Sequence, residues 1–359
     1  MVRLKDIAAQ AGVSVMTVSK ALRGAPDISA KTKTRIKLLA QQMGYVPDSM
    51  AQGLRSRTTK LLGLVLSTVT NPIFERTISA IEEGAHEWGY DLILAHTLNI
   101  PEREDACIRR LLSRRVDGLF IAPVYRLAPT APIYEELLQR QTPTVILGHR
   151  APFCAQFHNV ETDDVTGSYL ITRHLLELGH KRIAFLCGPS AAPWAQERLE
   201  GYRRALREAQ IEPDDRLTFT AGISIEEGEK AALQALNESA SMTAIQTADD
   251  LVAIGAANVF LNQGIKIPQE LSIAGFGNIL MSEHFRVPLT TVRQPKLRLG
   301  VAAMEMMQKL RRGERVESRR LPAEIIVRAS TATSLKKNGS VSPSARPYRT
   351  ARRKIRRST

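Results

Sequence analysis

The chain has 359 residues, a formal net charge of +14, 43% hydrophobic residues and three cysteines. This length predicts two or three domains, and the hydrophobic content is that of a soluble globular protein with a sizeable core. The cysteines are odd in number and widely spaced, and the seven histidines form no cluster with metal-ligand spacing, which argues against a disulfide scaffold and a zinc site.

The positive charge is concentrated at the two ends of the chain. Residues 1–60 hold eleven Lys and Arg against three Asp, a net +8, and residues 332–359 hold nine basic residues and no acidic one, a net +9. That leaves −3 for residues 61–331. Basic ends on a slightly acidic body indicate polyanion contact at the ends, although for the C-terminal run a merely solubilising role is the alternative. Since we find no secretory apolar core and no membrane-spanning run, we expect a cytoplasmic protein. We also expect no cofactor.

Residues 4–22 predict two short helices joined by a tight turn. Gly12 ends the first helix, whose apolar residues recur at helical spacing: Leu4, Ile7, Ala8 and Ala11. Ser14 is the expected N-cap of the second helix, because its hydroxyl can accept a hydrogen bond from an unpaired amide of the first turn. Two helices of about eight residues around a glycine turn are typical of a helix-turn-helix.

The second helix is expected to carry an exposed apolar pair, Val15 and Met16. The pair suits contact with thymine methyl groups, while Thr17, Ser19 and Lys20 suit contact with phosphates. The alternative is that Val15 and Met16 belong to the core of a small helical domain. Other residues already supply that core: Val13, Val18, Ala21 and Leu22.

A third helix is predicted over residues 29–44, with Ser29 as its N-cap and Gly44 at its end. Pro47 then interrupts the chain, and residues 49–57 form a short segment that is capable of helix formation. A helix of that length is marginal on its own in water. We expect it to fold only against a partner, such as a second copy of itself together with DNA.

From residue 60 onward, apolar strands alternate with helices. This pattern predicts parallel sheets covered on both faces, in two similar doubly wound units with ligands held at the carboxyl ends of the strands. Strands are expected at 61–67, 91–95, 118–123, 144–148, 182–187, 244–247, 271–276, 290–295 and 323–327. Helices are expected at 73–88, 102–115, 165–179, 197–209, 226–237, 251–263 and 297–311.

These motifs, in this order and spacing, resemble the LacI/GalR family of transcription regulators over nearly all of residues 3–331. The matching stretches include Lys5-Asp-Ile-Ala, Ala11-Gly-Val-Ser, Met43-Gly-Tyr-Val-Pro47, Ala51-Gln-Gly-Leu54, Arg198-Leu-Glu-Gly-Tyr202 and Pro288-Leu-Thr-Thr-Val292. The resemblance implies an all-α helix-turn-helix domain (1–46), a hinge (47–59) and an α/β effector domain of the periplasmic-binding-protein type (60–331). The effector domain would divide into an N-subdomain (about 60–160 plus 293–325) and a C-subdomain (about 161–290), followed by a basic disordered tail (332–359).

The resemblance also implies the partners and the site residues. A homodimer would read an approximately palindromic operator in double-stranded DNA, with Leu54 as the hinge leucine that wedges into the minor groove. The expected DNA-contacting residues are Ser14, Val15, Met16, Thr17, Ser19, Lys20, Arg23, Tyr45, Leu54 and Arg55. A small effector, by family a sugar or sugar derivative, would bind in the cleft of the α/β domain. Its expected contacts are Asn71, Phe74, Trp194, Arg198, Asp250 and Asn278.

The chain departs from the family pattern at three positions. Gly275-Phe276-Gly277-Asn278 lacks the aspartate that often holds the ligand, Asp249 replaces an Asn before Asp250, and Arg23 replaces an Asn after the recognition helix. These changes leave the effector and the operator sequence open.

Two other classes of protein fit less well. An enzyme would need a phosphate loop, a nucleophile elbow, a metal cluster or paired carboxylates, and we find none of these patterns. A sugar-binding transport protein would share the fold of residues 61–331 but would need a signal peptide and no helix-turn-helix. The tail over residues 335–359 has the composition of a disordered segment and lacks the leucine heptads of a tetramerising coiled coil, and we expect it to add nonspecific DNA affinity.

Overall fold

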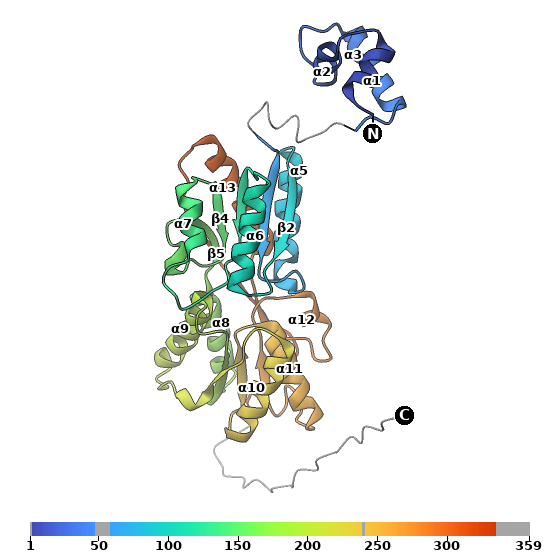
Figure 1. Cartoon of the computed structure of the whole chain (residues 1–359). Coiled ribbons are helices and arrows are strands. Elements are labelled where there is room, and N and C mark those ends of the chain that lie inside the picture. Colours follow the sequence, from blue (N-terminus) through green and yellow to red (C-terminus); the bar gives the residue numbers. More distant parts are fainter. Residues whose placement is uncertain (1, 47–57, 239–240, 335–359) are drawn as a thin grey trace, which may run out of the picture. The chain divides into compact units, whose positions relative to one another are not determined.

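The computed structural model describes residues 2–46, 58–238 and 241–334. The chain separates into two compact units, one comprising residues 1–61 with 115–117 and the other comprising the rest (Figure 1). The predicted helix over 49–57 and the predicted disorder of 335–359 lie outside the described residues. Within the described ranges, no helix has the length and apolar character needed to cross a membrane.

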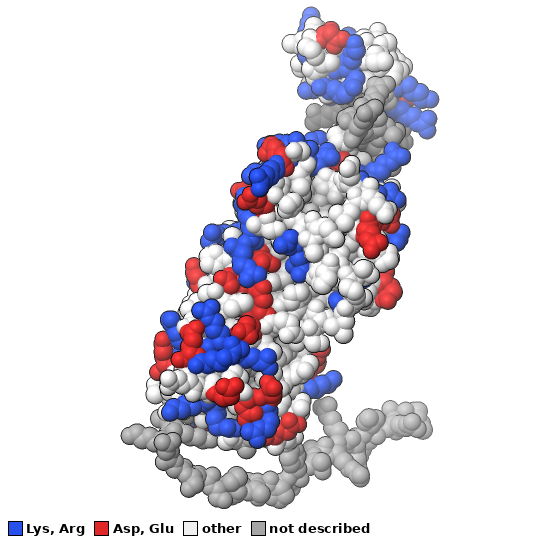
Figure 2. Space-filling model, turned by 90° about the vertical axis from the view of Figure 1, so that its left-hand side faces the viewer, with Lys and Arg blue, Asp and Glu red and all other residues white. Residues whose placement is uncertain are grey.

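The first unit contains the three predicted helices, α1 (Leu4–Ala11), α2 (Val15–Leu22) and α3 (Ala30–Gln42). Gly12 adopts a left-handed conformation with φ of 65°, which lets the chain turn sharply between α1 and α2. The helices enclose one small core, whose fully buried residues include Ile7, Val18, Ala21 and Ile36. Figure 2 shows that Lys and Arg dominate the charged side chains visible on this unit.

The second unit contains two parallel sheets, as predicted. The N-subdomain is built on a six-stranded sheet in the order β11-β5-β4-β3-β1-β2. Its strands are β1 (Leu61–Leu66), β2 (Asp91–His96), β3 (Gly118–Ile121), β4 (Thr144–Leu147), β5 (His158–Thr162) and β11 (Arg319–Leu321). One face packs on α5 (Glu75–Glu87) and α13 (Lys296–Arg312), and the other on α6 (Pro101–Ser113) and α7 (Pro132–Gln139) (Figure 1).

The C-subdomain is built on a four-stranded parallel sheet in the order β7-β6-β8-β9. Its strands are β6 (Ile183–Cys187), β7 (Thr218–Thr220), β8 (Ala244–Thr247) and β9 (Ser272–Ala274). The helices α8 (Asp164–Glu177) and α9 (Pro193–Glu208) pack on one face, and α10 (Ile225–Glu238) and α11 (Asp250–Asn262) on the other. Gly201 lets α8 and α9 come close together, because a Cβ there would lie 2.2 Å from the carbonyl oxygen of Val165.

The remaining elements are short. They are the 3-10 turns η1 (Pro72–Phe74), η2 (Pro152–Cys154) and η3 (Asp215–Leu217), the helix α12 (Leu280–His284), and the antiparallel pair β10 (Thr291–Arg293) and β12 (Glu324–Ile326). The sequence interpretation missed α7, β5, β7, α12 and β11. Of these, β5 and β11 matter most, because they run beside each other at the edge of the N-subdomain sheet and lead into the C-subdomain.

The outer surface of α8 and α9 carries many paired charges. Figure 2 shows basic and acidic side chains intermixed on the face that includes these helices. Three exposed pairs account for part of it: Arg173 with Glu177, Arg204 with Glu208, and Arg207 with Glu200. Exposed pairs of this kind contribute little to stability, because solvent screens their charges. This surface is therefore a solvated face of alternating charge.

Candidate functional site

The first turn of α2 presents an apolar pair to solvent. Val15 is 46% exposed and Met16 is 52% exposed, whereas Val18 and Ala21 on the opposite face are fully buried. Ser14 caps the helix as predicted, because its Oγ accepts a hydrogen bond of 3.1 Å from the backbone amide of Thr17. The alternative that Val15 and Met16 form the core of this domain is therefore wrong.

Three of the other predicted DNA-contacting residues make contacts within the protein. Lys20 Nζ donates a hydrogen bond to Asp27, and Arg23 Nε donates one of 3.1 Å to the carbonyl oxygen of Ser19. Tyr45 is half-buried against the core of the unit. Two further predicted residues, Leu54 and Arg55, lie outside the described residues.

A cavity of about 190 Å³ lies between the two sheets of the second unit. Its walls come from the carboxyl ends of strands in both subdomains. Residues that follow a strand and line the cavity are Ser67, Asn99, Pro123, Gly148 and His149 in the N-subdomain, and Pro189 and Asp249 in the C-subdomain. Ligands of parallel α/β sheets bind at this end of the strands, so the cavity occupies the expected position.

Four of the six predicted effector-contacting residues line this cavity: Asn71, Phe74, Trp194 and Arg198. Arg198 is 5% exposed and is held on several sides. Its Nε donates a hydrogen bond of 3.0 Å to Asp164 Oδ1, its Nη2 lies 2.9 Å from the same oxygen in an ion pair, and its Nη1 donates a hydrogen bond to the carbonyl oxygen of Ala248. The guanidinium lies 3.7 Å from the ring centre of Phe276 and 4.5 Å from that of Trp194. This side chain is thus fixed in orientation at the cavity wall.

The other two predicted residues, Asp250 and Asn278, are not among the residues that line the cavity. Asp250 is 1% exposed and accepts three hydrogen bonds, from the amide of Ile279 at 3.0 Å and from the hydroxyls of Ser282 and Thr291, each at 2.6 Å. Asn278 Oδ1 accepts a hydrogen bond of 2.9 Å from Arg328 Nη2. Both side chains are therefore bonded to neighbouring protein groups, and their contact with an effector stays a prediction.

The sequence interpretation did not assign the remaining charged residues of the cavity wall. These are His149, Glu161, Asp164, Asp249 and Lys296. Lys296 Nζ donates hydrogen bonds of 3.0 and 2.8 Å to the carbonyl oxygens of Gly277 and Asn278. A signal was present for two of them, because His149 and Asp249 stand just beyond the ends of strands that the sequence did predict.

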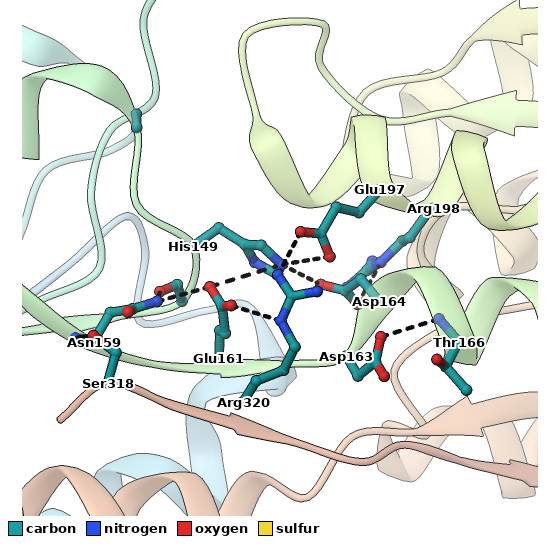
Figure 3. A network of polar contacts seen from close by, with 12 residues as sticks. His149, Asn159, Glu161, Asp163, Asp164, Thr166, Glu197, Arg198, Ser318 and Arg320 are labelled. Carbon is teal, nitrogen blue, oxygen red and sulfur yellow. Dashed lines mark hydrogen bonds and ion pairs between the residues drawn. The ribbon is translucent and has the colours of Figure 1, made fainter. Parts of the chain in front are cut away.

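A polar network joins the two subdomains beside the cavity (Figure 3). His149 of the N-subdomain places Nε2 at 3.0 Å from Glu197 Oε2 and 3.5 Å from Asp164 Oδ2, and both of these carboxylates belong to the C-subdomain. Arg320 of β11 donates hydrogen bonds of 2.8 Å to Glu161 and 2.6 Å to Glu197. We call His149, Glu161, Asp164, Glu197 and Arg320 the hinge cluster.

The hinge cluster shifts the pKa values of its members. Burial alone would lower the pKa of His149, but the hydrogen bond with Glu197 and the negative charges of Asp164, Glu197 and Glu161 outweigh burial and raise it. Burial opposes ionisation of Glu197 as well, but His149 and Arg320 keep its pKa below the usual value. The pKa of Asp164 is raised, because burial outweighs the charges of Arg198 and His149. The cluster is therefore a set of interacting charges that links one subdomain to the other.

Comparison with known proteins identifies the family of both units. Residues 3–48 match the lacI family of bacterial regulatory proteins, and residues 172–331 match a periplasmic binding protein-like domain. The regulator DegA of Bacillus subtilis is 32% identical over 329 residues, which cover 91% of this chain and 97% of DegA.

Two solved structures are similar as well. The lac repressor dimer bound to operator and the anti-inducer ONPF has a TM-score of 0.82 at 28% identity and covers 92% of this chain and 99% of its own. A LacI family regulator from Enterococcus faecium with bound ribose has a TM-score of 0.68 at 28% identity and covers 76% and 99%. The chain belongs to the lacI family of bacterial regulatory proteins and is a DNA-binding transcription regulator with an effector-binding domain.

Proposed function

We propose that this regulator is a repressor that binds a roughly palindromic operator as a homodimer and releases or holds it in response to a small effector, by family a sugar or sugar derivative. The observation that carries the DNA-binding part is the exposed pair Val15 and Met16 on the first turn of α2. An apolar pair placed beside hydroxyl and basic side chains suits the thymine methyl groups and phosphates of a major groove. A homodimer would present two such helices to two half-sites.

The cavity supports the effector part of the proposal. It is smaller than the range of about 300–1,000 Å³ that is usual for drug-sized ligands, which favours a ligand about the size of one sugar ring. Phe74, Tyr125 and Trp194 line it together with several amide and hydroxyl side chains. Aromatic faces suit the apolar side of a sugar ring, and the polar groups suit its hydroxyls. The similar regulator from Enterococcus faecium binds ribose.

Operator binding is tested by footprinting promoter fragments with the full-length protein. We expect protection of a palindrome whose half-sites lie about one helical turn or a multiple of it apart. Fluorescence anisotropy then compares Met16→Ala with Leu38→Ala, which removes an apolar side chain that is 55% exposed on α3. Met16→Ala should weaken specific binding by about tenfold or more, and Leu38→Ala should change it little. Equal binding by Met16→Ala and the wild-type protein would contradict the assignment of α2 as the reading helix.

The predicted hinge segment between the two units, which is distinct from the hinge cluster, adds a second test. We propose that residues 49–57 fold over the minor groove and that Leu54 is the apolar wedge. Leu54→Ala should therefore weaken specific operator binding while it leaves effector affinity nearly unchanged. Sedimentation of the free protein should give the mass of a dimer, and a monomer at the concentrations that bind operator would contradict the proposed assembly.

A further inference from the structure

One carboxylate on the cavity wall makes no direct ion pair with another described residue, although the charges of Arg198 and Lys296 act on it. Asp249 is 9% exposed, lines the cavity and caps α11, with Oδ1 accepting a hydrogen bond of 2.8 Å from the amide of Leu251. Among residues 2–46, 58–238 and 241–334, no ion pair includes Asp249. Burial, assisted by the neighbouring charge of Asp250, raises the pKa of Asp249 to about 7. A buried carboxyl of this kind gains much from a positively charged partner.

The cations that line the same cavity are already engaged by the protein. Arg198 is bonded to Asp164 and to the carbonyl oxygen of Ala248, and Lys296 donates to two backbone carbonyl oxygens. His149 is turned to Glu197 and Asp164 in the hinge cluster (Figure 3). An anionic ligand would have to displace these bonds, whereas a cationic ligand would meet Asp249 without displacing any cation.

We propose that the effector carries a positively charged amino group on a hydroxyl-rich ring and that Asp249 selects this group over a neutral hydroxyl. The inference rests on the proposed function, because it assumes that the cavity holds the effector. The amino group would donate to the carboxylate of Asp249, and the ring would lie among Phe74, Tyr125 and Trp194. A charge-assisted hydrogen bond in a buried site is stronger than the bond that a neutral hydroxyl makes there.

Asp249→Asn removes the charge with little change in shape. Asparagine is as good an N-cap as aspartate, so α11 keeps its first hydrogen bond and the variant should fold. Asp163→Asn is the matched control. Asp163 also caps a helix, α8, with its carboxylate accepting from the amide of Thr166 at 3.1 Å, but it does not line the cavity.

Calorimetric titration of the full-length protein at pH 7.5 tests the proposal with three matched sugar pairs: glucosamine with glucose, galactosamine with galactose, and mannosamine with mannose. In at least one pair the amine should bind about tenfold tighter or more than the neutral sugar. Asp249→Asn should abolish that preference, and Asp163→Asn should keep it. A neutral sugar that binds as tightly as its amine, or a preference that survives in Asp249→Asn, would overturn the proposal.

The pH dependence provides a second readout. Asp249 is faced by Asp250 on its own helix, by Arg198 on α9 and by Lys296 on α13, and burial lowers the pKa of Lys296. Lowering the pH from 7.5 to 5.5 protonates the carboxylate, and this loss outweighs the gain of charge on the sugar amine, which is only partly protonated at pH 7.5. Amine binding should therefore weaken by about tenfold in the wild-type protein. The same loss in Asp249→Asn would assign it to His149 or another group and would refute the role of Asp249.

The proposed function is judged separately, by operator anisotropy on the same preparations. If operator is bound and a neutral sugar is preferred, or if no member of any pair binds, the amine proposal is wrong and operator recognition stands. If the protein binds no operator while the amine preference and its loss in Asp249→Asn are observed, the selectivity of the cavity stands and the proposed regulatory role falls.

Discussion

Glu197→Gln removes the charge that links the two subdomains in the hinge cluster. Glu197 accepts a hydrogen bond of 2.6 Å from Arg320 Nη2, and its other oxygen lies 3.0 Å from His149 Nε2. Its side chain is 23% exposed and that of His149 is 5% exposed. These contacts are therefore intermediate in burial. Surface pairs contribute almost nothing to stability, and the disruption of buried pairs is strongly destabilising. We expect Glu197→Gln to lower the free energy of unfolding by about 1–2 kcal/mol at pH 5.5.

The loss should depend on pH because one of the two partners of Glu197 titrates. The pKa of His149 is raised in the folded protein, so its stabilising contribution is fully present below the unfolded pKa of about 6.5 and disappears as the pH rises through the folded value. Glu197 stays ionised at pH 5.5 because its pKa is lowered, and Arg320 stays charged throughout. The difference between the wild-type protein and the variant should therefore shrink by about 1 kcal/mol between pH 5.5 and 8.5.

Urea unfolding followed by tryptophan fluorescence measures this difference, and Trp194 on α9 lies three residues from the substitution. Glu200→Gln is the control, because Glu200 lies on the same helix, is 52% exposed and pairs with Arg207 and not with a histidine. Its effect should stay within about 0.5 kcal/mol at both pH values. If the Glu197→Gln difference is the same at pH 5.5 and 8.5, His149 does not pair with Glu197 as described.

Three further substitutions test other parts of the fold. Ser14→Ala should lower the stability of the helical unit by about 1 kcal/mol, measured by thermal unfolding of residues 1–46 within the full chain, because the cap bond to Thr17 is lost. Arg198→Lys should weaken effector binding by about tenfold or more in calorimetry, since lysine cannot stack between Trp194 and Phe276 while it bonds to Asp164. Gly201→Ala should destabilise the C-subdomain by about 1–3 kcal/mol in urea, because the added methyl group meets backbone of α8, and unchanged stability would contradict the close packing.

Most of the fold could be predicted because its elements have strong local signals. The apolar strands β1, β3 and β6 and the capped helices α2 and α3 are defined by their own residues. The missed strands β5, β7 and β11 have mixed compositions, such as His-Asn-Val-Glu-Thr in β5. They are strands because neighbouring strands offer free edges, and such a tertiary cause leaves no pattern in the segment itself.

The candidate site was predictable to the extent that its residues follow predicted strands or match a family motif. Arg198 and Asn71 were found in this way, whereas the hinge cluster was not. Its members come from β5, β11, α8, α9 and the second residue after β4, and two of these elements were missed. Their side chains meet only because the two sheets are joined by chain segments that run side by side.

The assignment of roles to Asp249 and Asp250 can be tested directly, because the sequence predicted Asp250 as an effector contact whereas the structure places Asp249 on the cavity wall. The sequence alone cannot assign different roles to two adjacent aspartates, but their backbone conformations differ. Asp249 has an extended backbone as the N-cap of α11, whereas Asp250 begins the helix and turns its carboxylate beneath the cavity. Gly275 leaves room for it there, because a Cβ at that position would lie 2.1 Å from Asp250 Oδ1.

Asp250→Asn should therefore act on stability and not primarily on effector binding. The three donors around Asp250 would face an amide that accepts through one oxygen only, which should lower the free energy of unfolding by about 1–3 kcal/mol. Asp249→Asn should leave thermal stability nearly unchanged while it alters ligand selectivity. The reverse result, a stable Asp250→Asn protein that has lost its effector and an Asp249→Asn protein with unaltered binding, would restore Asp250 as the contact that the family resemblance implied.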